Sequence, residues 1–155
     1  MREEARNVLL RLKAEGEYQV YLPESPLPQE DFYKACAESY LVISPAGAGW
    51  DCYRHYEAAL CGSVPVMNYP GIRRYRPFLE GEHAFFYDLE DSGLERCIRR
   101  ALADRPRLVE MGQNARRHVL QYHLYSKLLL MMLKELSKLA SNADYEHIRS
   151  PNGAP

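Results

Sequence analysis

The chain has 155 residues, long enough for one domain of ordinary size, and its 46% hydrophobic and 26% charged residues are typical of a folded globular protein. Its formal net charge of −1 excludes the global positive field that would favour nucleic acid or an anionic membrane as partner. The apolar run 128–133 is too short to span a bilayer, and the charged amino-terminal residues do not form a signal-peptide pattern. We therefore expect a cytoplasmic protein, or one at the cytoplasmic face of a membrane.

The cysteines support the same expectation. Their spacing matches no zinc-binding pattern, and the histidines show no metal-ligand spacing either. We interpret the thiols as small hydrophobic groups in a reducing compartment rather than as a disulfide framework. The four cysteines are Cys36, Cys52, Cys61 and Cys97.

The amino-terminal third predicts two helices with a short strand between them. Residues 2–15 have helical composition, with Gly16 as the stop signal. Tyr18–Leu22 alternates weakly between apolar and polar residues, which predicts a short strand. Pro28 then lies near the first turn of a helix over 29–39.

The next thirty residues carry the most information. Leu41–Ile43 is apolar and β-branched, as expected of a strand covered on both faces, and a glycine-rich turn follows at 45–49. Asp51 can cap a helix that ends where Gly62 can adopt the left-handed conformation. Val64–Met67 begins the next strand. The order strand, glycine turn, helix, strand predicts a βαβ unit whose turn presents backbone N–H groups to an anion such as phosphate.

The carboxyl-terminal part is predicted to be mostly helical. A loop at Pro70–Gly81 leads to a short strand at Ala84–Tyr87, and Asp91 and Ser92 can cap the helix after it. Three helices are expected, over about 93–103, 105–122 and 124–139. Residues 141–155 should form a frayed, flexible tail.

This alternation of strands and helices predicts an α/β fold in which helices flank both faces of a mainly parallel, Rossmann-like sheet. We expect one domain over residues 1–140, followed by the tail. Ligands of such sheets bind beyond the carboxyl ends of the strands. This places Ala46–Tyr53 and Asn68–Arg76 at the same rim.

The pattern G-x-G-x-D-x-x-R-x-x-E-A-x-x-C-G-x-V-P-V runs from Gly47 to Val66. It resembles the C-terminal, donor-binding half of GT-B glycosyltransferases (group 1), most closely their spore-coat (CgeB-like) and exostosin-like subgroups. The similarity extends over roughly residues 28–135. It implies a C-terminal GT-B half that binds a nucleotide-diphosphate sugar for transfer to an unknown acceptor, with no bound metal and no further cofactor.

The resemblance also implies which residues hold the donor. Glu57 matches the glutamate that holds the ribose hydroxyls, a role that suits a carboxylate because it accepts two hydrogen bonds from a vicinal diol. The glycine turn matches the diphosphate cradle, and Arg54 lies one helical turn before Glu57, where it could reach phosphate oxygens. The predicted donor-binding residues are Gly47, Gly49, Asp51, Tyr53, Arg54 and Glu57.

The chain also departs from the family pattern. Many retaining members carry a second glutamate eight positions before Glu57, where this chain has Gly49. The family's amino-terminal Rossmann half and its usual Arg/Lys diphosphate pair have no counterpart here, so Arg73 and Arg74, or Arg76, are the candidate diphosphate contacts. No catalytic residue can be assigned from the pattern, although His83 would be the first to test as a base.

We therefore interpret the chain as a fragment or one half of a split enzyme, inactive alone in hexosyl or related transfer. Its expected partners are an amino-terminal GT-B half or a second copy of itself. A non-catalytic nucleotide-sugar binding module is the alternative. A receiver or NAD-binding domain is disfavoured, because the acidic residues and the third glycine that these folds need are missing.

Overall fold

The computed structural model describes all residues except residue 91 and residues 149–155, and it describes side chains as far as residue 140. The chain forms two compact units, Met1–Leu120 and Gln121–Pro155, which are considered separately.

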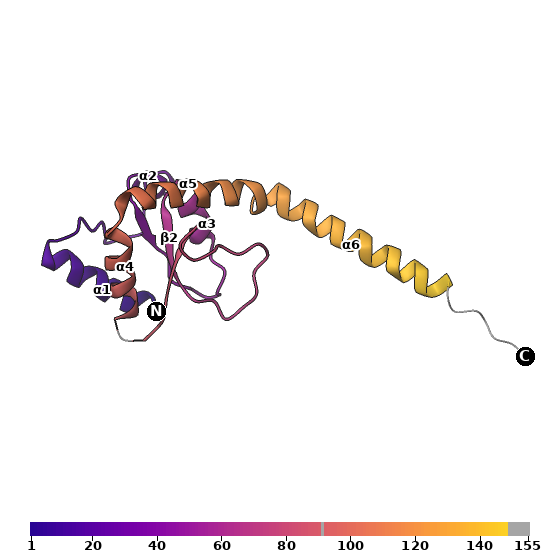
Figure 1. Cartoon of the computed structure of the whole chain (residues 1–155), viewed down its shortest axis with the longest axis horizontal. Helices are drawn as coiled ribbons and strands as arrows, with labels where there is room; N and C mark the ends of the chain where they lie inside the picture. The colour runs from indigo at the N-terminus through magenta and orange to yellow at the C-terminus, as the bar shows by residue number, and fades with distance from the viewer. Residues whose placement is uncertain (91, 149–155) are drawn as a thin grey trace, which may run out of the picture. The chain divides into compact units, whose positions relative to one another are not determined.

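The first unit contains the sheet and most of the helices (Figure 1). Helix α5 belongs to this unit as far as Leu120. The elements of the unit in chain order are α1 (Arg2–Glu15), α2 (Gln29–Ala37), β1 (Leu41–Ile43), α3 (Tyr53–Leu60), β2 (Val64–Asn68), β3 (Phe85–Tyr87), α4 (Gly93–Leu102) and α5 (Arg105–Tyr122).

The described strands form a three-stranded parallel sheet in the order β1-β2-β3. Leu41 of β1 is opposite Val64 of β2, and Val66 of β2 is opposite Phe85 of β3. Every residue of β2 is buried, as expected for a central strand with helices over both faces. The predicted α/β fold with a parallel sheet is confirmed.

The first core lies between one face of the sheet and helices α1 and α4. Val64 and Val66 point to this face because side chains alternate along a strand. Helix α1 buries Val8 and Leu12 against it, one turn apart on its apolar stripe. Helix α4 contributes Leu94, Cys97, Ile98 and Ala101.

The second core covers the opposite face. Met67 of β2 points to this side and packs in one cluster with Ala59 of α3 and with Ala115 and Val119 of α5. The helices therefore flank both faces of the sheet, as predicted. This sandwich fixes the carboxyl ends of β1 and β2, where the ligand-binding rim was expected.

Helix α5 passes very close to the turn that follows α3. A Cβ atom at Gly112 would overlap the carbonyl oxygen of Gly62. Gly62 itself has φ 89, the left-handed conformation predicted for a glycine at the end of this helix.

Two predictions about local structure in the first half of the chain are wrong. Tyr18–Leu22 is irregular rather than a strand, because it joins no ladder, although Tyr18 and Val20 pack against the first core. Asp51 does not cap α3: the helix starts at Tyr53 with Cys52 as its N-cap residue and has no side-chain cap bond. The Asp51 carboxylate is instead held by two other side chains, described below.

Helix α4 also begins without the predicted cap. Ser92 is the N-cap residue, but its side chain makes no cap bond, and Asp91 lies outside the described residues. The described cysteines are free thiols: Cys36 and Cys97 are buried, whereas Cys52 and Cys61 are only half-buried.

The second unit consists of the end of α5 and helix α6 (Tyr125–Ile148). The helix continues beyond its predicted end near residue 139 and includes the first residues of the predicted tail. The rest of that predicted tail, 149–155, lies outside the described residues. Large apolar side chains are exposed along α6, namely Tyr125, Leu129, Leu130, Met132, Leu133, Leu136 and Leu139. In the described part of the chain, none of the helices has the length and apolarity needed to cross a membrane.

We expect Gly112→Ala to lower the free energy of unfolding, although alanine normally stabilises a helix by about 1 kcal/mol relative to glycine. The added methyl group would force α5 away from Gly62, and such overpacking costs about 1–3 kcal/mol. Urea denaturation would measure the change, with the exposed neighbour Gln113→Ala as control. A variant Gly112→Ala more stable than the wild type would contradict this close approach.

Candidate functional site

The candidate site lies at the carboxyl ends of β1 and β2, where the two predicted rim segments meet. The backbone N–H of Ala46, just after β1, donates to Oδ1 of Asn68 at 2.8 Å. Asn68 ends β2 and is only 2% exposed, and its amide nitrogen donates to the carbonyl of Tyr69 at 3.2 Å. One buried side chain thus joins the two segments. No local sequence pattern indicates this role of Asn68.

The glycine turn leaves its backbone accessible. The N–H of Gly47 donates to the carbonyl of Gly49 at 3.2 Å, and the Cys52 thiol donates to the same carbonyl at 3.4 Å. Ala48 and Gly49 are exposed, and a Cβ atom at Gly49 would meet no atom. A ligand can therefore approach this backbone closely.

A cation from a distant part of the chain lies against this turn. A Cβ atom at Gly47 would overlap the guanidinium of Arg2, so any other residue at position 47 would make this flexible side chain shift. Arg2 is the first residue of α1 and is exposed. In the part of the chain that the structure describes, no hydrogen bond or ion pair uses its guanidinium. Sequence reasoning missed Arg2, because nothing in its neighbourhood indicates a contact with residue 47.

The guanidinium of Arg74 fastens the loop after β2 to the loop before α3. Its side chain is only 5% exposed, and its Nε lies 3.3 Å from Oδ1 of Asp51. Its Nη2 donates to the carbonyl of Trp50. The hydroxyl of Tyr56 donates to the same Asp51 oxygen at 2.7 Å. Arg74, predicted as a candidate diphosphate contact, is thus largely occupied by contacts within the protein.

A buried histidine supports the loop before α3. Nδ1 of His55 lies 2.8 Å from the Ser44 hydroxyl, and its Nε2 lies 3.4 Å from the Trp50 carbonyl. Burial, and next the positive charge of Arg74, lower the pKa of His55 to about 4. These contacts fit a neutral ring whose Nδ1 accepts a hydrogen bond from the Ser44 hydroxyl and whose Nε2–H donates one to the Trp50 carbonyl. His55 is therefore a buried residue whose ring joins the end of β1 to the loop before α3.

Arg54 and Glu57 lie on the side of α3 that faces α2. Oε1 of Glu57 accepts a hydrogen bond from the Tyr33 hydroxyl at 3.2 Å. Burial, then Cys61 and then Glu57 raise the pKa of Cys36, and Arg54 lowers it, with a net rise to about 12. Both α3 charges therefore act on this α2 thiol. The structure therefore brings Asp51 and Arg74 together beside the glycine turn, and groups Arg54 and Glu57 against α2.

Three further sequence candidates lie at the surface or away from the turn. Tyr53 is 74% exposed at the start of α3, and Arg73 is exposed in the loop after β2. His83 does not lie at this rim. It is buried just before β3, with its ring 4.4 Å from that of His118 and 6.1 Å from that of Phe78.

We expect the stability of the protein to fall as the pH drops from about 6.5 toward 4, and His55 to cause part of this loss. The folded-state pKa of His55 lies below its ordinary value of 6.5, so between these values the unfolded state binds more protons. The contribution is complete above pH 6.5 and is lost as the pH falls toward the folded-state pKa, up to about 3 kcal/mol. Denaturation of wild type and His55→Gln over this pH range would measure it. The variant His83→Gln measures the separate contribution of the second histidine whose pKa is lowered by burial. An unchanged pH slope in His55→Gln would contradict the assignment.

Comparisons with known proteins agree with this architecture. Residues 7–71 match the family described as the RXYLT1 C-terminal domain, a segment that contains β1, the glycine turn, α3 and β2. The ribitol-5-phosphate xylosyltransferase 1 of Danio rerio is 38% identical over 72 residues, which cover 43% of this chain and 17% of that protein. The chain therefore spans only a small part of this relative's length.

A solved structure shows the same fold. The sucrose-phosphate synthase from Thermosynechococcus elongatus superposes with a TM-score of 0.56 at 20% sequence identity, over 72% of this chain and 27% of that protein. The resemblance predicted from the sequence is confirmed at this level. The chain has the fold of the C-terminal half of a GT-B glycosyltransferase, and over residues 7–71 it is similar in sequence to a glycosyltransferase C-terminal domain.

Proposed function

We propose that this chain is the donor-binding part of a glycosyltransferase and binds a nucleotide-diphosphate sugar beside the glycine turn. The observation that carries the proposal is the exposed turn at Ala48 and Gly49, a few residues before the amino end of α3 and beside the guanidinium of Arg2. Backbone N–H groups at a helix start favour an anion, and a nearby guanidinium adds a charge and a planar fork of donors.

The charges around the turn support a diphosphate there. Asp51 would repel a phosphate if its carboxylate were unpaired, but Arg74 and the Tyr56 hydroxyl hold it. Arg2 then supplies the accessible positive charge, in place of the Arg/Lys pair that the family pattern would lead one to expect. Arg73, exposed in the loop after β2, is the second candidate.

Glu57 is proposed to hold the ribose. One of its carboxylate oxygens accepts from Tyr33, while Oε2 takes part in no hydrogen bond or ion pair in the described part of the chain. A carboxylate with one free oxygen can accept a further hydrogen bond from a ribose hydroxyl. Arg54, one turn earlier, would lie between ribose and phosphate, and the exposed ring of Tyr53 would border the site.

The donor sugar and the acceptor are proposed only by analogy. The name of the Danio rerio relative describes transfer of xylose to ribitol 5-phosphate. A pentose is therefore a candidate donor sugar for this chain beside the hexoses.

Transfer itself is proposed to need a partner. The chain spans 17% of the xylosyltransferase, and GT-B transfer takes place between two domains. The apolar side chains exposed along α6 support an amino-terminal half, or a second copy of the chain, as the surface that covers them. Isolated, the chain would bind donor without transferring sugar.

A non-catalytic nucleotide-sugar binding module is the second candidate function. It is favoured by His55, which follows the turn in the chain: both of its ring nitrogens are engaged, and the ring is buried and neutral at pH 7. Sugar transfer by this chain together with an amino-terminal half would decide between the two. A cytoplasmic location also stays a proposal, supported by the free thiols.

We expect Arg2→Gln to weaken binding of a nucleoside diphosphate but not of the matching nucleoside. Loss of a charged hydrogen bond costs about 1.5–3 kcal/mol, or roughly 10- to 100-fold in affinity. Calorimetric titration with UDP, GDP and ADP, each compared with its nucleoside, would measure this difference. The control is Arg6→Gln, an exposed arginine one turn along the same helix. Equal affinity of Arg2→Gln and wild type for every diphosphate would remove Arg2 from the site.

We expect Glu57→Gln to weaken both the nucleoside and the nucleoside diphosphate, by about 1.5–3 kcal/mol, with little effect on thermal stability. The reason is that the ribose belongs to both ligands. Tyr33→Phe separates the two roles of the carboxylate, since it removes the internal hydrogen bond but keeps the charge. If Glu57→Gln lowered the melting temperature strongly while binding survived, the carboxylate would be structural.

A further inference from the structure

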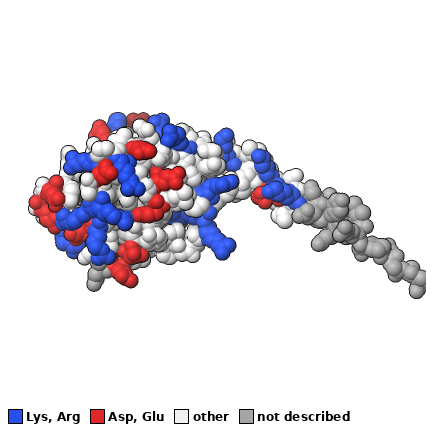
Figure 2. Space-filling view, viewed as in Figure 1, with Lys and Arg blue, Asp and Glu red and all other residues white. Residues whose placement is uncertain are grey.

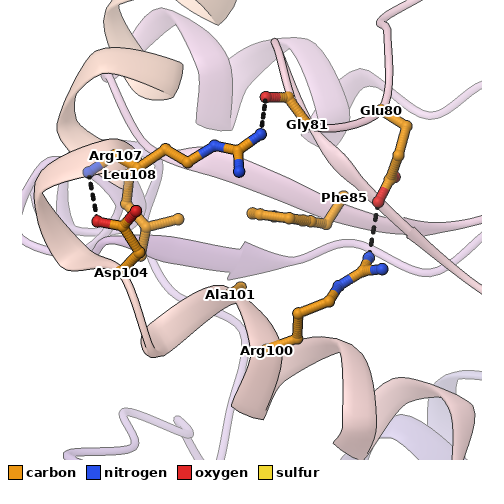
Figure 3. A pocket seen from close by; sticks show the side chains of 8 residues that line it. All are labelled: Glu80, Gly81, Phe85, Arg100, Ala101, Asp104, Arg107 and Leu108. Atoms are coloured by element: carbon orange, nitrogen blue, oxygen red, sulfur yellow. Dashed lines mark hydrogen bonds and ion pairs between the residues drawn. The ribbon is translucent and has the colours of Figure 1, made fainter.

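A second concave surface lies at the other end of the sheet. A pocket of about 280 Å³ opens at the amino end of β3, whereas the glycine turn lies at the carboxyl ends of the parallel strands. Figure 3 shows its lining, which comes from the turn before β3, the end of α4 and the start of α5. The lining residues are Glu80, Gly81, Phe85, Arg100, Ala101, Asp104, Arg107 and Leu108.

The polar side chains of this pocket are held in place by the protein. Arg100 pairs with Oε1 of Glu80 at 2.7 Å, and Oε2 of Glu80 accepts the backbone N–H of Phe86 at 2.6 Å. Nη2 of Arg107 donates to the carbonyl of Gly81 at 3.1 Å, which links two residues of the lining (Figure 3). Oδ1 of Asp104 accepts the backbone N–H of Arg107 at 3.2 Å. The pocket is therefore preorganised.

The formal charge of the lining is balanced. Two guanidinium groups face two carboxylates, so a charged ligand would gain little net attraction. Over the visible face of the molecule, acidic and basic side chains are likewise interspersed (Figure 2). Many hydrogen-bonding positions nevertheless remain, because each guanidinium has five donors and each carboxylate accepts several bonds. This combination fits an uncharged ligand that carries many hydroxyl groups.

The apolar part of the lining fits the same ligand class. The ring of Phe85 points into the pocket between the two arginines, with Leu108 and Ala101 beside it (Figure 3). A pyranose or a short polyol presents C–H groups to such a surface while its hydroxyls reach the surrounding polar groups. The volume lies slightly below the usual lower limit of about 300 Å³ for small-molecule sites, which restricts the occupant to about one sugar unit.

We propose that this pocket binds one uncharged sugar or polyol unit, at a site separate from the proposed nucleotide site beside the glycine turn. The charge balance and the mixed polar and apolar lining carry this inference, which does not depend on the proposed donor site.

The test is an amide-detected NMR titration of the whole chain with D-xylose and D-glucose, and with glucose 6-phosphate and glucosamine as charged counterparts. The neutral sugars should shift the amide signals of Gly81, Ala101 and Leu108, with dissociation constants in the millimolar range. Addition of UDP, GDP or ADP should leave these shifts unchanged.

Two variants test the lining. Arg107→Gln should weaken sugar binding at least about fivefold, as expected when a charged hydrogen bond is lost. Asp104→Ser should weaken it too, while serine keeps the hydrogen-bond acceptor that caps α5. The matched control Arg105→Gln, on the same helical turn but outside the lining, should bind as the wild type does.

The proposal is overturned if the neutral sugars shift none of these signals, if only the charged sugars do, or if a nucleoside diphosphate displaces them. Unchanged binding in both lining variants would overturn it as well. The signals of residues 47–49, followed in the same samples, report on nucleotide binding beside the glycine turn. Absence of sugar binding in the pocket is therefore distinguishable from absence of nucleotide binding at the turn.

Discussion

The candidate site depends on one nearly buried guanidinium. Arg74 is brought in by the loop after β2, and its positive charge must be compensated because a buried charge without partners is strongly unfavourable. The carbonyl of Trp50 and the carboxylate of Asp51 supply this compensation, and both belong to the loop before α3. The arginine thereby fastens two loops that follow different strands, and the glycine turn is held between the end of β1 and this fastened segment.

Two arginines have different roles beside the glycine turn. Arg74 is inside the protein and organises the loops, whereas Arg2 is exposed and lies over Gly47 with its guanidinium free for a ligand. From sequence position alone, Arg74 was the candidate phosphate contact, because it follows β2 closely. Arg2 was not considered, because it is far from the motif in the chain. Burial distinguishes the two: a side chain that is 5% exposed cannot easily leave its internal partners for a phosphate.

The central βαβ unit was predictable because its signals are local. An apolar β-branched run, a glycine turn and Gly62 in the left-handed conformation mark β1, the end of α3 and the start of β2. Asp51 was misassigned because a carboxylate before a helix is a usual cap, whereas here Arg74, more than twenty residues away, competes for it.

Long-range contacts explain the other omissions. The roles of Arg2 and Asn68 depend on which segments the fold brings together, and neither residue has a distinctive local pattern. The predicted strand at Tyr18–Leu22 fails for a related reason: alternation favours a strand, but a strand also needs a neighbour with which to pair. Tyr18 and Val20 of that segment pack against the first core, although the segment does not join the sheet.

The central claim is that the edge beside the glycine turn recognises a diphosphate through its backbone. The most direct measurement is an NMR titration of the isotope-labelled chain with UDP, GDP or ADP, followed at the amide signals of Gly47, Ala48 and Gly49. These signals should shift with at least one diphosphate and much less with the matching nucleoside. Amide shifts confined to other parts of the chain, or none with any of the three nucleotides, would contradict it.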